Sequence, residues 1–367
     1  MFHPSGVLGL TGEKHTEPNN LSETLFCQTL FCRTLSPNAF SVRGLSTADY
    51  QTIHLFTHST LDSLHIFAPA TVANVAAGFD ILGFALNNPG DEILIRKTDA
   101  PGIVIRNQTE FAGMPLQPEK NTAGVALQAL LQHLGSEQGF EIVFLKKIKP
   151  GSGIGSSAAS SAAAVFGANL LLGSPLQAID LVQFAMQGEK LASGTAHADN
   201  VAPALMGGFV LVRSYQPLDL VTIPVPENLY ASVIHPQIEL KTEDSRRVLR
   251  KQILLKDAVV QWGNTAGLIA GLFKSDYELI GRSLQDVIIE PVRSLLIPGY
   301  ESIKDAALRA GALGCCISGS GPSIFALSNA ESTAREVAQA MQTVCARNGI
   351  DSEIHVSLIN TQGPRVV

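Results

Sequence analysis

The sequence is short of charge, of aromatic side chains and of long apolar runs. Only 16% of its 367 residues are charged, 6% are aromatic, and the formal net charge is -6. So mild a charge gives no reason to expect nucleic acid or an anionic membrane as a partner. No apolar stretch reaches the ~18 residues of a membrane span. The N-terminus lacks a basic segment followed by an apolar core, so we expect no secretory signal.

Cysteine spacings typical of metal sites and of disulfide frameworks are also missing. Five cysteines occur, an odd number, and none lies in a CxxC spacing: Cys27, Cys32, Cys315, Cys316 and Cys345. The adjacent pair lies in the apolar run GALGCCISG, which predicts a buried strand. This usage favours structural thiols in a reducing compartment, and therefore a cytoplasmic protein.

A hydrophobic fraction of 46% and this length predict a globular protein with two domains. Residues 1–63 are rich in Ser, Thr, Asn and His, and we expect a poorly ordered extension. A targeting peptide is the alternative, although residues 1–49 hold four acidic against three basic residues, and transit peptides are poor in acids. We place the two domains at 64–220 and 221–367, because prolines and turn residues cluster near 215–230.

The apolar periodicity after residue 63 predicts an α+β fold. Strands are expected at 64–73, 92–97, 102–107, 140–148, 207–213, 220–225, 230–235, 313–317, 323–328 and 353–359. Helices are expected at 121–134, 156–172, 175–190, 300–310 and 330–346, with a helix-rich block over 243–284.

The sharpest motif is PGSGIGSSAASS at 150–161, which follows a strand and opens a helix. Alternate glycines allow backbone N–H groups to crowd round an anion, and the helix N-terminus adds unpaired N–H groups. The chain has no Gly-Lys dipeptide and no GxGxxG, which excludes a Walker loop and a dinucleotide fingerprint. The motif therefore predicts a phosphate-binding loop without its own lysine, whose charge compensation comes most simply from Mg²⁺. A glycine turn that only caps the helix is the alternative.

An acidic residue lies on the apolar side of the next helix. Ile179, Val182, Ala185 and Met186 form one stripe, and Glu189 continues it. A carboxylate on an inward face must be paired, protonated or bound to a metal. We expect a Mg²⁺ ligand beside the phosphate loop; a glutamate at a helix end that turns to solvent or pairs with Lys190 is the alternative.

Taken together, several segments resemble the GHMP kinase superfamily (galactokinase, homoserine, mevalonate and phosphomevalonate kinases), and most closely its homoserine kinases. They are PATVANVAAGFDILGFAL, PGSGIGSSAAS, HADNVAPALMGG, the KT…SR segment, EPVRSLLIPG and SGSGPS. The resemblance runs in order from about Leu64 to the C-terminus. It implies a ribosomal-S5-like N-terminal domain, a ferredoxin-like C-terminal domain and an active site in the cleft between them.

The resemblance also implies roles for individual residues. Those that would bind homoserine are Asn74, Asp80, His197, Arg246 and Arg293, with the arginines on the carboxylate and Asp80 on the amino or hydroxyl end. Asn200, His197 and Asp80 would be the catalytic residues, Asn200 standing where several sister kinases have Asp. Ser157 and Glu189 match Mg²⁺ ligands, and ATP would contact Asn121, Pro150, Gly151, Ser152, Gly153, Ile154, Gly155, Ser156, Ser157, Ser318, Gly319 and Ser320. Ser245 departs from the usual Ala, which leaves the choice between Arg246 and Arg247 open.

The implied activity is ATP-dependent phosphorylation of the L-homoserine hydroxyl, giving O-phospho-L-homoserine for threonine synthesis. A mevalonate-type kinase would need one carboxylate anchor and usually an Asp at position 200. A non-catalytic nucleotide-binding regulator would be expected to lack Glu189 or Ser157. The expected partner is a small molecule, without nucleic acid or membrane; the sequence leaves homodimer formation open.

Overall fold

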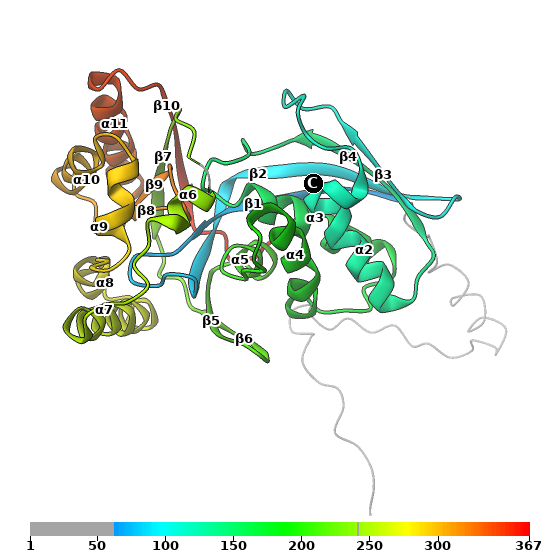
Figure 1. Cartoon of the computed structure of the whole chain (residues 1–367), viewed down its shortest axis with the longest axis horizontal. Helices are drawn as coiled ribbons and strands as arrows, with labels where there is room; N and C mark the ends of the chain where they lie inside the picture. Colours follow the sequence, from blue (N-terminus) through cyan, green and yellow to red (C-terminus); the bar gives the residue numbers. More distant parts are fainter. Residues whose placement is uncertain (1–61, 241) are drawn as a thin grey trace, which may run out of the picture. The chain divides into compact units, whose positions relative to one another are not determined.

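Two sheets, each covered by helices, make up the part of the chain that the computed structural model describes, residues 62–240 and 242–367 (Figure 1). The expected extension, with Cys27 and Cys32, falls outside these residues, and Ser63 already begins the first strand. Within the described residues no helix is both long enough and apolar enough to span a bilayer.

The first sheet has seven strands, ordered β11-β1-β2-β4-β3, with β5 paired to β2 and β6 paired to β5. Its strands are β1 (Ser63–Ala73), β2 (Leu82–Thr98), β3 (Ile103–Asn107), β4 (Gly139–Lys146), β5 (Phe209–Tyr215), β6 (Leu218–Ile223) and β11 (Arg365–Val366). The helices of this half are η1 (Pro118–Lys120), α2 (Thr122–Leu134), α3 (Ser156–Leu171), α4 (Ala178–Ser193) and α5 (Val201–Met206). A core of buried side chains joins α2, α3, α4 and α5 to β1, β2 and β4.

The second sheet has four antiparallel strands in the order β10-β7-β9-β8. They are β7 (Tyr230–Pro236), β8 (Gly314–Ile317), β9 (Ile324–Ser328) and β10 (Ser352–Leu358). Numbered along the chain this is the order 4-1-3-2 of a ferredoxin-like βαββαβ unit, as expected. The helices of this half are α6 (Thr242–Arg247), α7 (Leu255–Lys274), α8 (Tyr277–Ser283), α9 (Glu290–Arg293), η2 (Ser294–Leu296), α10 (Tyr300–Arg309) and α11 (Glu331–Arg347).

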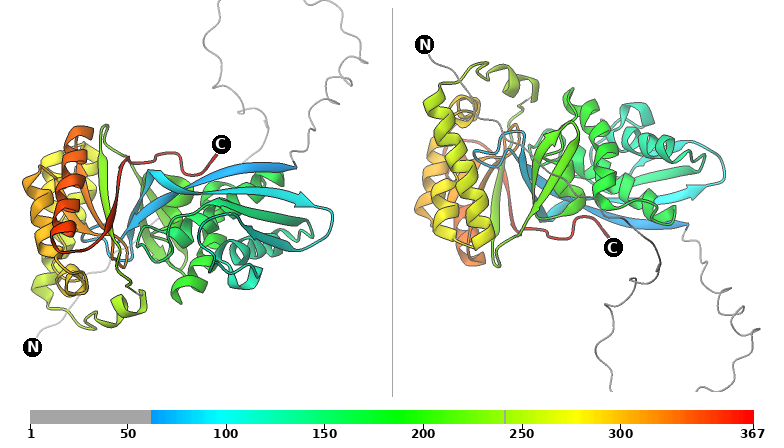
Figure 2. Two further views of the ribbon diagram at one scale, coloured as in Figure 1. Left: turned by 90° about the horizontal axis from the view of Figure 1, so that it is seen from above. Right: turned by 90° about the horizontal axis from the view of Figure 1, so that it is seen from below.

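Alternate residues of the second sheet enter two different cores. Cys315 and Ile324 pack with α10 and α11, whereas Cys316 and Phe325 face a core shared with β1, β2, α7 and α8. Figure 2 shows α10 and α11 on the side of this sheet away from the first sheet. In the shared core Phe84 of β2 contacts Phe325 of β9, with ring centroids 5.6 Å apart. This packing fixes the two sheets, and therefore the loops between them, relative to each other.

Candidate active site

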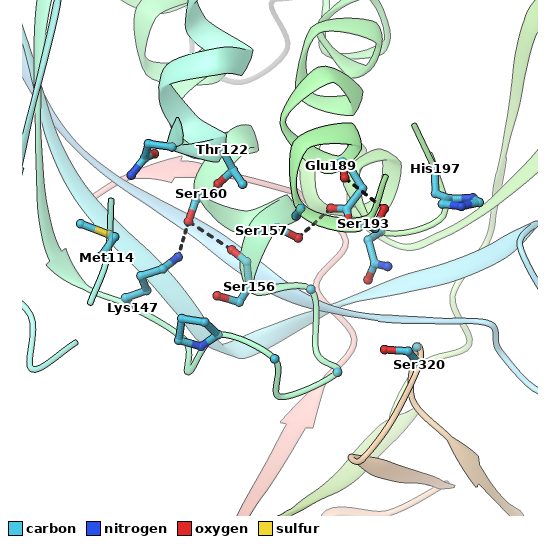
Figure 3. Close-up of a pocket in the computed structure, with 18 of the residues that line it drawn as sticks. Met114, Thr122, Lys147, Ser156, Ser157, Ser160, Glu189, Ser193, His197 and Ser320 are labelled. Atoms are coloured by element: carbon cyan, nitrogen blue, oxygen red, sulfur yellow. Dashed lines mark hydrogen bonds between the residues drawn. The ribbon is translucent and has the colours of Figure 1, made fainter. Parts of the chain in front are cut away.

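One cavity of about 810 Å³ draws its walls from both sheets (Figure 3). Most residues predicted for the site line it: Asn74, Asp80, Asn121, Pro150, Gly151, Gly153, Gly155, Ser156, Ser157, Glu189, His197, Asn200, Arg246, Arg293, Gly319 and Ser320. The first sheet and its helices contribute the glycine loop, and the second half contributes the two arginines and the 318–321 turn. Segments far apart in the sequence therefore meet at a single site.

The loop at 150–155 enters α3 with three glycines in left-handed conformations, at φ values of 76°, 83° and 69°. A Cβ on Gly155 would lie 2.0 Å from Thr71 Oγ1, and one on Gly153 would lie 2.6 Å from the Gly321 carbonyl oxygen. Both positions therefore exclude any side chain. The small residues of α3 allow it to pack closely on its neighbours, because all but three of its sixteen residues are buried. The N-terminus of a rigid helix thus faces the cavity.

Three residues predicted to contact ATP do not line the cavity. Ser152 is 2% exposed, Ile154 1% and Ser318 0%. The Ser318 hydroxyl donates to the Gly153 carbonyl oxygen at 2.7 Å, and the Ser323 hydroxyl donates to the Ser152 carbonyl oxygen at 2.6 Å. The hydroxyls of Ser318 and Ser323 thus join the phosphate loop to the 318–323 turn, and ATP contacts through the backbone of Ser152, Ile154 and Ser318 stay a prediction.

Ser157 and Glu189 point toward each other from α3 and α4 (Figure 3). The Ser157 hydroxyl donates to Glu189 Oε2 at 2.7 Å, and Glu189 is only 8% exposed. The predicted inward face of Glu189 is confirmed, although Ile179, placed on the same stripe, is 42% exposed. Val182 and Ala185 of the predicted stripe are buried as well, and the buried face extends to Leu181, Phe184 and Gly188. Burial raises the pKa of Glu189, against the hydrogen bond from Ser157 and the charge of Arg246.

A lysine that the sequence analysis missed lies just before the loop. Lys147 Nζ is 3.2 Å from Asp91 Oδ2, and the Ser160 hydroxyl donates to the same oxygen at 2.6 Å. The Ile148 N–H donates to the other oxygen of Asp91. Because both Lys147 and Asp91 are buried, the pair is electrically balanced within the protein. Asp91 therefore offsets the positive charge of Lys147 at this side of the cavity.

A second cluster lies beside His197. Arg246 Nη2 donates to Asp80 Oδ1 at 3.0 Å and to His197 Nε2 at 2.8 Å. The second bond needs a lone pair on Nε2, which places the imidazole proton on Nδ1, 3.7 Å from Asp80 Oδ1. Burial lowers the pKa of His197, Asp80 opposes this and Arg246 adds to it, so the neutral ring is favoured. Arg247 points outward and pairs with Asp244; the arginine at the cavity is Arg246.

Arg293 is a buried cation whose hydrogen bonds go to backbone carbonyls. It is 3% exposed, Nε donates to the Ser245 oxygen at 3.2 Å, and Nη1 donates to the Gly319 oxygen at 3.0 Å. Among the ion pairs within residues 62–240 and 242–367, none involves Arg293. Burial and Arg246 lower the pKa of Arg293 to about 10, which still leaves it charged at neutral pH. It lies over the ring of Phe79, 5.0 Å from the centroid.

Three asparagines predicted for the site make hydrogen bonds within the protein. Asn74 has φ 56°, accepts the Asp80 N–H at 2.8 Å and donates to the Gly319 oxygen at 2.8 Å. Asn121 caps α2 by accepting the Ala123 N–H at 3.0 Å. Asn200 Oδ1 accepts the Thr71 hydroxyl at 2.8 Å, which leaves its NH₂ group to donate. Asn74 and Asn121 therefore have structural roles, and their contacts with substrate and ATP stay predictions.

Further cavity residues escaped the sequence analysis. They are Glu110, Phe111, Met114, Pro115, Lys120, Thr122, Lys147, Ser160, Ser193 and Asp199, among others. Burial, with the charges of Asp80 and Glu189, raises the pKa of Asp199 to about 7. The HADN motif signalled Asp199, but the 110–115 loop carries no pattern that distinguishes it from any other polar turn. Among the described residues no group of three His, Cys, Asp or Glu could hold a metal ion.

Comparison with known proteins assigns both halves. Residues 121–208 match the family described as GHMP kinases N terminal domain, and residues 268–347 match GHMP kinases C terminal. A homoserine kinase of Chlorobaculum tepidum is 48% identical over 314 residues, covering 82% of this chain and 97% of that protein. A homoserine kinase of Xylella fastidiosa is 41% identical over 312 residues, covering 85% of this chain and 96% of that protein.

Solved structures of related proteins show the same likeness. The crystal structure of homoserine kinase from Cytophaga hutchinsonii is 56% identical, with a TM-score of 0.82, and covers 85% of this chain and 99% of that one. The mevalonate kinase of L. major in complex with R-mevalonate is 18% identical, with a TM-score of 0.63, over 80% of this chain and 96% of that one. The second likeness shows the shared fold alone.

Proposed function

The chain belongs to the homoserine kinase family within the GHMP kinases, and from that premise we propose that its cavity transfers the γ-phosphoryl group of ATP to the hydroxyl of L-homoserine. The observation that carries the proposal is the meeting of two sites in one cavity. The phosphate loop and the Ser157–Glu189 pair lie at one site, and Asp80, His197 and the two arginines lie at the other. Donor and acceptor can then be held side by side, which is most of what phosphoryl transfer needs.

The second cluster suits a zwitterionic amino acid. Arg246 and Asp80 hold each other at 3.0 Å, and a substrate with a carboxylate and an ammonium group offers each of them a partner of opposite charge. Buried Arg293 supplies a second guanidinium for the carboxylate. Mevalonate has a carboxylate but no ammonium group, so it would offer Asp80 no partner of opposite charge. We therefore propose homoserine over a mevalonate-type substrate.

The Ser157–Glu189 pair fits a Mg²⁺ ion. Its donors are a hydroxyl and a buried carboxylate beside a phosphate loop, and Mg²⁺ prefers one or two such ligands together with phosphate oxygens and water. When bound, the ion would add positive charge beside the phosphates, where Lys147 is already balanced by Asp91. We propose Ser157 and Glu189 as its protein ligands.

We propose that no side chain acts as a general base. Asn200 occupies the place of a base in sister kinases, and an amide cannot take the hydroxyl proton. Its NH₂ group, directed by Thr71, can donate to the substrate oxygen and orient it. The lone pair on His197 Nε2 is occupied by Arg246. A loose transition state needs little activation of the nucleophile, so the proton can pass late to a phosphate oxygen.

A coupled assay of ADP release tests the activity. The protein is given homoserine, mevalonate or galactose in turn, with ATP and Mg²⁺, and a Ser157→Ala variant serves as the control for contaminating kinases. We expect turnover with homoserine alone and a large loss of it in the variant. Turnover with mevalonate, or none with any substrate, would contradict the proposal; the second result would favour the non-catalytic regulator.

We also infer that two copies associate through α7. Leu255, Val259, Trp262 and Phe273 are 71%, 56%, 62% and 58% exposed, and their spacing places them on one face of the helix. A contiguous exposed apolar row of this kind marks an interface. A second copy is the simplest occupant, because one row packs against its own equivalent across a two-fold axis.

We propose a cytoplasmic location, where ATP is available and thiols stay reduced. Cys315, Cys316 and Cys345 are free and buried. Burial raises the pKa of Cys345, which keeps its thiol protonated and unreactive.

A further inference from the structure

The helix that carries Arg293 is too short to be stable without contacts to other parts of the protein. α9 has four residues, and Arg293 is the last of them. One turn fixes several residues for a single intrahelical hydrogen bond, so it needs contacts from outside to persist. Ile289, which precedes α9, has no side-chain capping bond. The conformation of this turn, and with it the position of the guanidinium, must be set by other residues.

Asp286 supplies those contacts. Its Oδ1 accepts the N–H groups of Ile288 and Ile289, both at 2.9 Å, and its Oδ2 accepts the Glu290 N–H at 3.0 Å. Three backbone donors at the start of a helix are thereby satisfied by one carboxylate, whose negative charge also suits a helix N-terminus.

Gln261 of α7 braces the carboxylate from the other side. Its Nε2 donates to Asp286 Oδ1 at 2.8 Å, and its Oε1 accepts the Val287 N–H at 3.0 Å. Gln261 is 7% exposed. Because the amide nitrogen and the amide oxygen of Gln261 both hydrogen-bond to the 286–287 loop, this side chain fixes the loop to the 20-residue helix α7. Since Thr265 of α7 also donates to the Ala77 oxygen, the same helix holds the loop that carries Phe79.

We propose that Asp286, braced by Gln261, is a positioning residue for homoserine binding, because it fixes the helix from which Arg293 reaches the cavity. The inference rests on the proposed role of Arg293 as a carboxylate contact. A displacement of a substrate-holding group by 1 Å can cost orders of magnitude in rate, so a loose α9 should weaken homoserine binding selectively. ATP binds at the opposite glycine loop, which Asp286 does not contact.

The test compares two aspartates with the same structural task. Asp276 caps α8, accepting the Leu279 N–H at 2.9 Å, but α8 carries no residue that lines the cavity. We expect Asp286→Ala to raise the homoserine KM by about tenfold or more, while the ATP KM stays unchanged. Asp276→Ala should lower the melting temperature and change neither KM. Gln261→Met, which keeps the shape but loses both hydrogen bonds, should raise the homoserine KM in the same sense by a smaller factor.

A double variant separates positioning from a direct or general effect. If Asp286 acts through Arg293, adding Asp286→Ala to Arg293→Ala should produce no further rise in the homoserine KM. A rise as large as in the native background, or equal changes in both KM values, would overturn the inference. The inference would also fail if Arg293→Ala raised the homoserine KM while Asp286→Ala and Gln261→Met left it unchanged. That result would not contradict the proposed function. An unchanged homoserine KM in Arg293→Ala would instead remove the proposed role of Arg293, and the positioning role with it.

Discussion

At the scale of single residues, Glu189 gives the sharpest expectation. Glu189→Gln keeps the shape of the side chain and the hydrogen bond from Ser157. It removes the negative charge that we propose binds Mg²⁺. The loss of a metal ligand is worth a few kcal/mol, so kcat should fall about 10²–10³-fold and the Mg²⁺ dependence should weaken. Asp180→Asn, on the exposed first turn of the same helix, is the control and should leave kcat unchanged. Normal kinetics of Glu189→Gln at subsaturating Mg²⁺ would refute the assignment.

Adjacent arginines provide a matched pair. Arg246 contacts Asp80 and His197 at the cavity, whereas Arg247 pairs with Asp244 at the surface. Arg246→Ala should raise the homoserine KM far more than the ATP KM, and Arg246→Lys should rescue it poorly because a point charge does not replace the guanidinium fork. Steady-state kinetics of Arg247→Ala should resemble those of the native protein. The reverse outcome would show that our assignment is off by one residue.

Much of the residue-level site could be predicted from the sequence, for a physical reason. Glycines that require positive φ, a serine pair at a helix start and a carboxylate on an apolar stripe are local patterns. The Lys147–Asp91 pair could not be found in this way, since Asp91 lies on β2 and Lys147 follows 56 residues later, just after β4. Nor could the burial of Ser318, because only the meeting of the two glycine-rich turns encloses it.

At the scale of elements, strand β2 departs most from expectation. The sequence predicts a strand over 92–97, but β2 runs from Leu82 to Thr98. Asn87, Asn88 and Pro89 read as a break, because proline cannot donate to a ladder. In the structure they lie opposite the register shift between Pro69 and Thr71, where β1 and β2 are not paired. The short helices α5 and α9 were missed because four to six residues show no helical period.

Strand β7 carries a buried histidine whose titration should be visible in stability. Burial and the nearby Lys149 lower the pKa of His235 to about 4. The unfolded chain would bind this proton near ~6.5. The neutral ring therefore contributes stability that is fully present above pH ~6.5 and is lost as the pH falls toward about 4.

His235→Gln, which can still contact Ser323, removes this titration. We expect the melting temperature of the native protein to fall more steeply than that of the variant between pH 7 and pH 4.5. Parallel melting curves over this range would contradict the prediction.

At the scale of the whole molecule, the first expectation concerns residues 1–61. Among the described residues, all those that line the cavity lie at or after Asn74. A chain that begins at Asp62 retains the first strand and all the cavity residues that the structure describes, so it should fold and keep its kcat and both KM values. The test measures the steady-state kinetics of the truncated and full-length chains, once their melting temperatures show that both are folded. A soluble truncated protein with a severe loss of turnover would show that the extension takes part in catalysis.

Association through α7 gives the second expectation at this scale. Light scattering at micromolar concentration should report twice the mass of one chain. Trp262→Glu places a charge in the middle of the apolar row and should yield a monomer with the same cavity. Val221→Glu, an exposed apolar residue on β6, is the control and should remain a dimer. A monomeric native protein would disprove the interface.

The hydrogen bonds between the phosphate loop and the 318–323 turn have a consequence for protein engineering. The Ser318 hydroxyl holds Gly153, the Ser323 hydroxyl holds Ser152, and a Cβ on Gly153 would meet Gly321. The two halves of the chain are thus not exchangeable modules. A chimera that combines the first half of this chain with the second half of another kinase would need both glycine turns from one parent, or its two halves would not close on each other. Recombination in this family should therefore succeed only where the two turns, about 165 positions apart, are inherited as a pair.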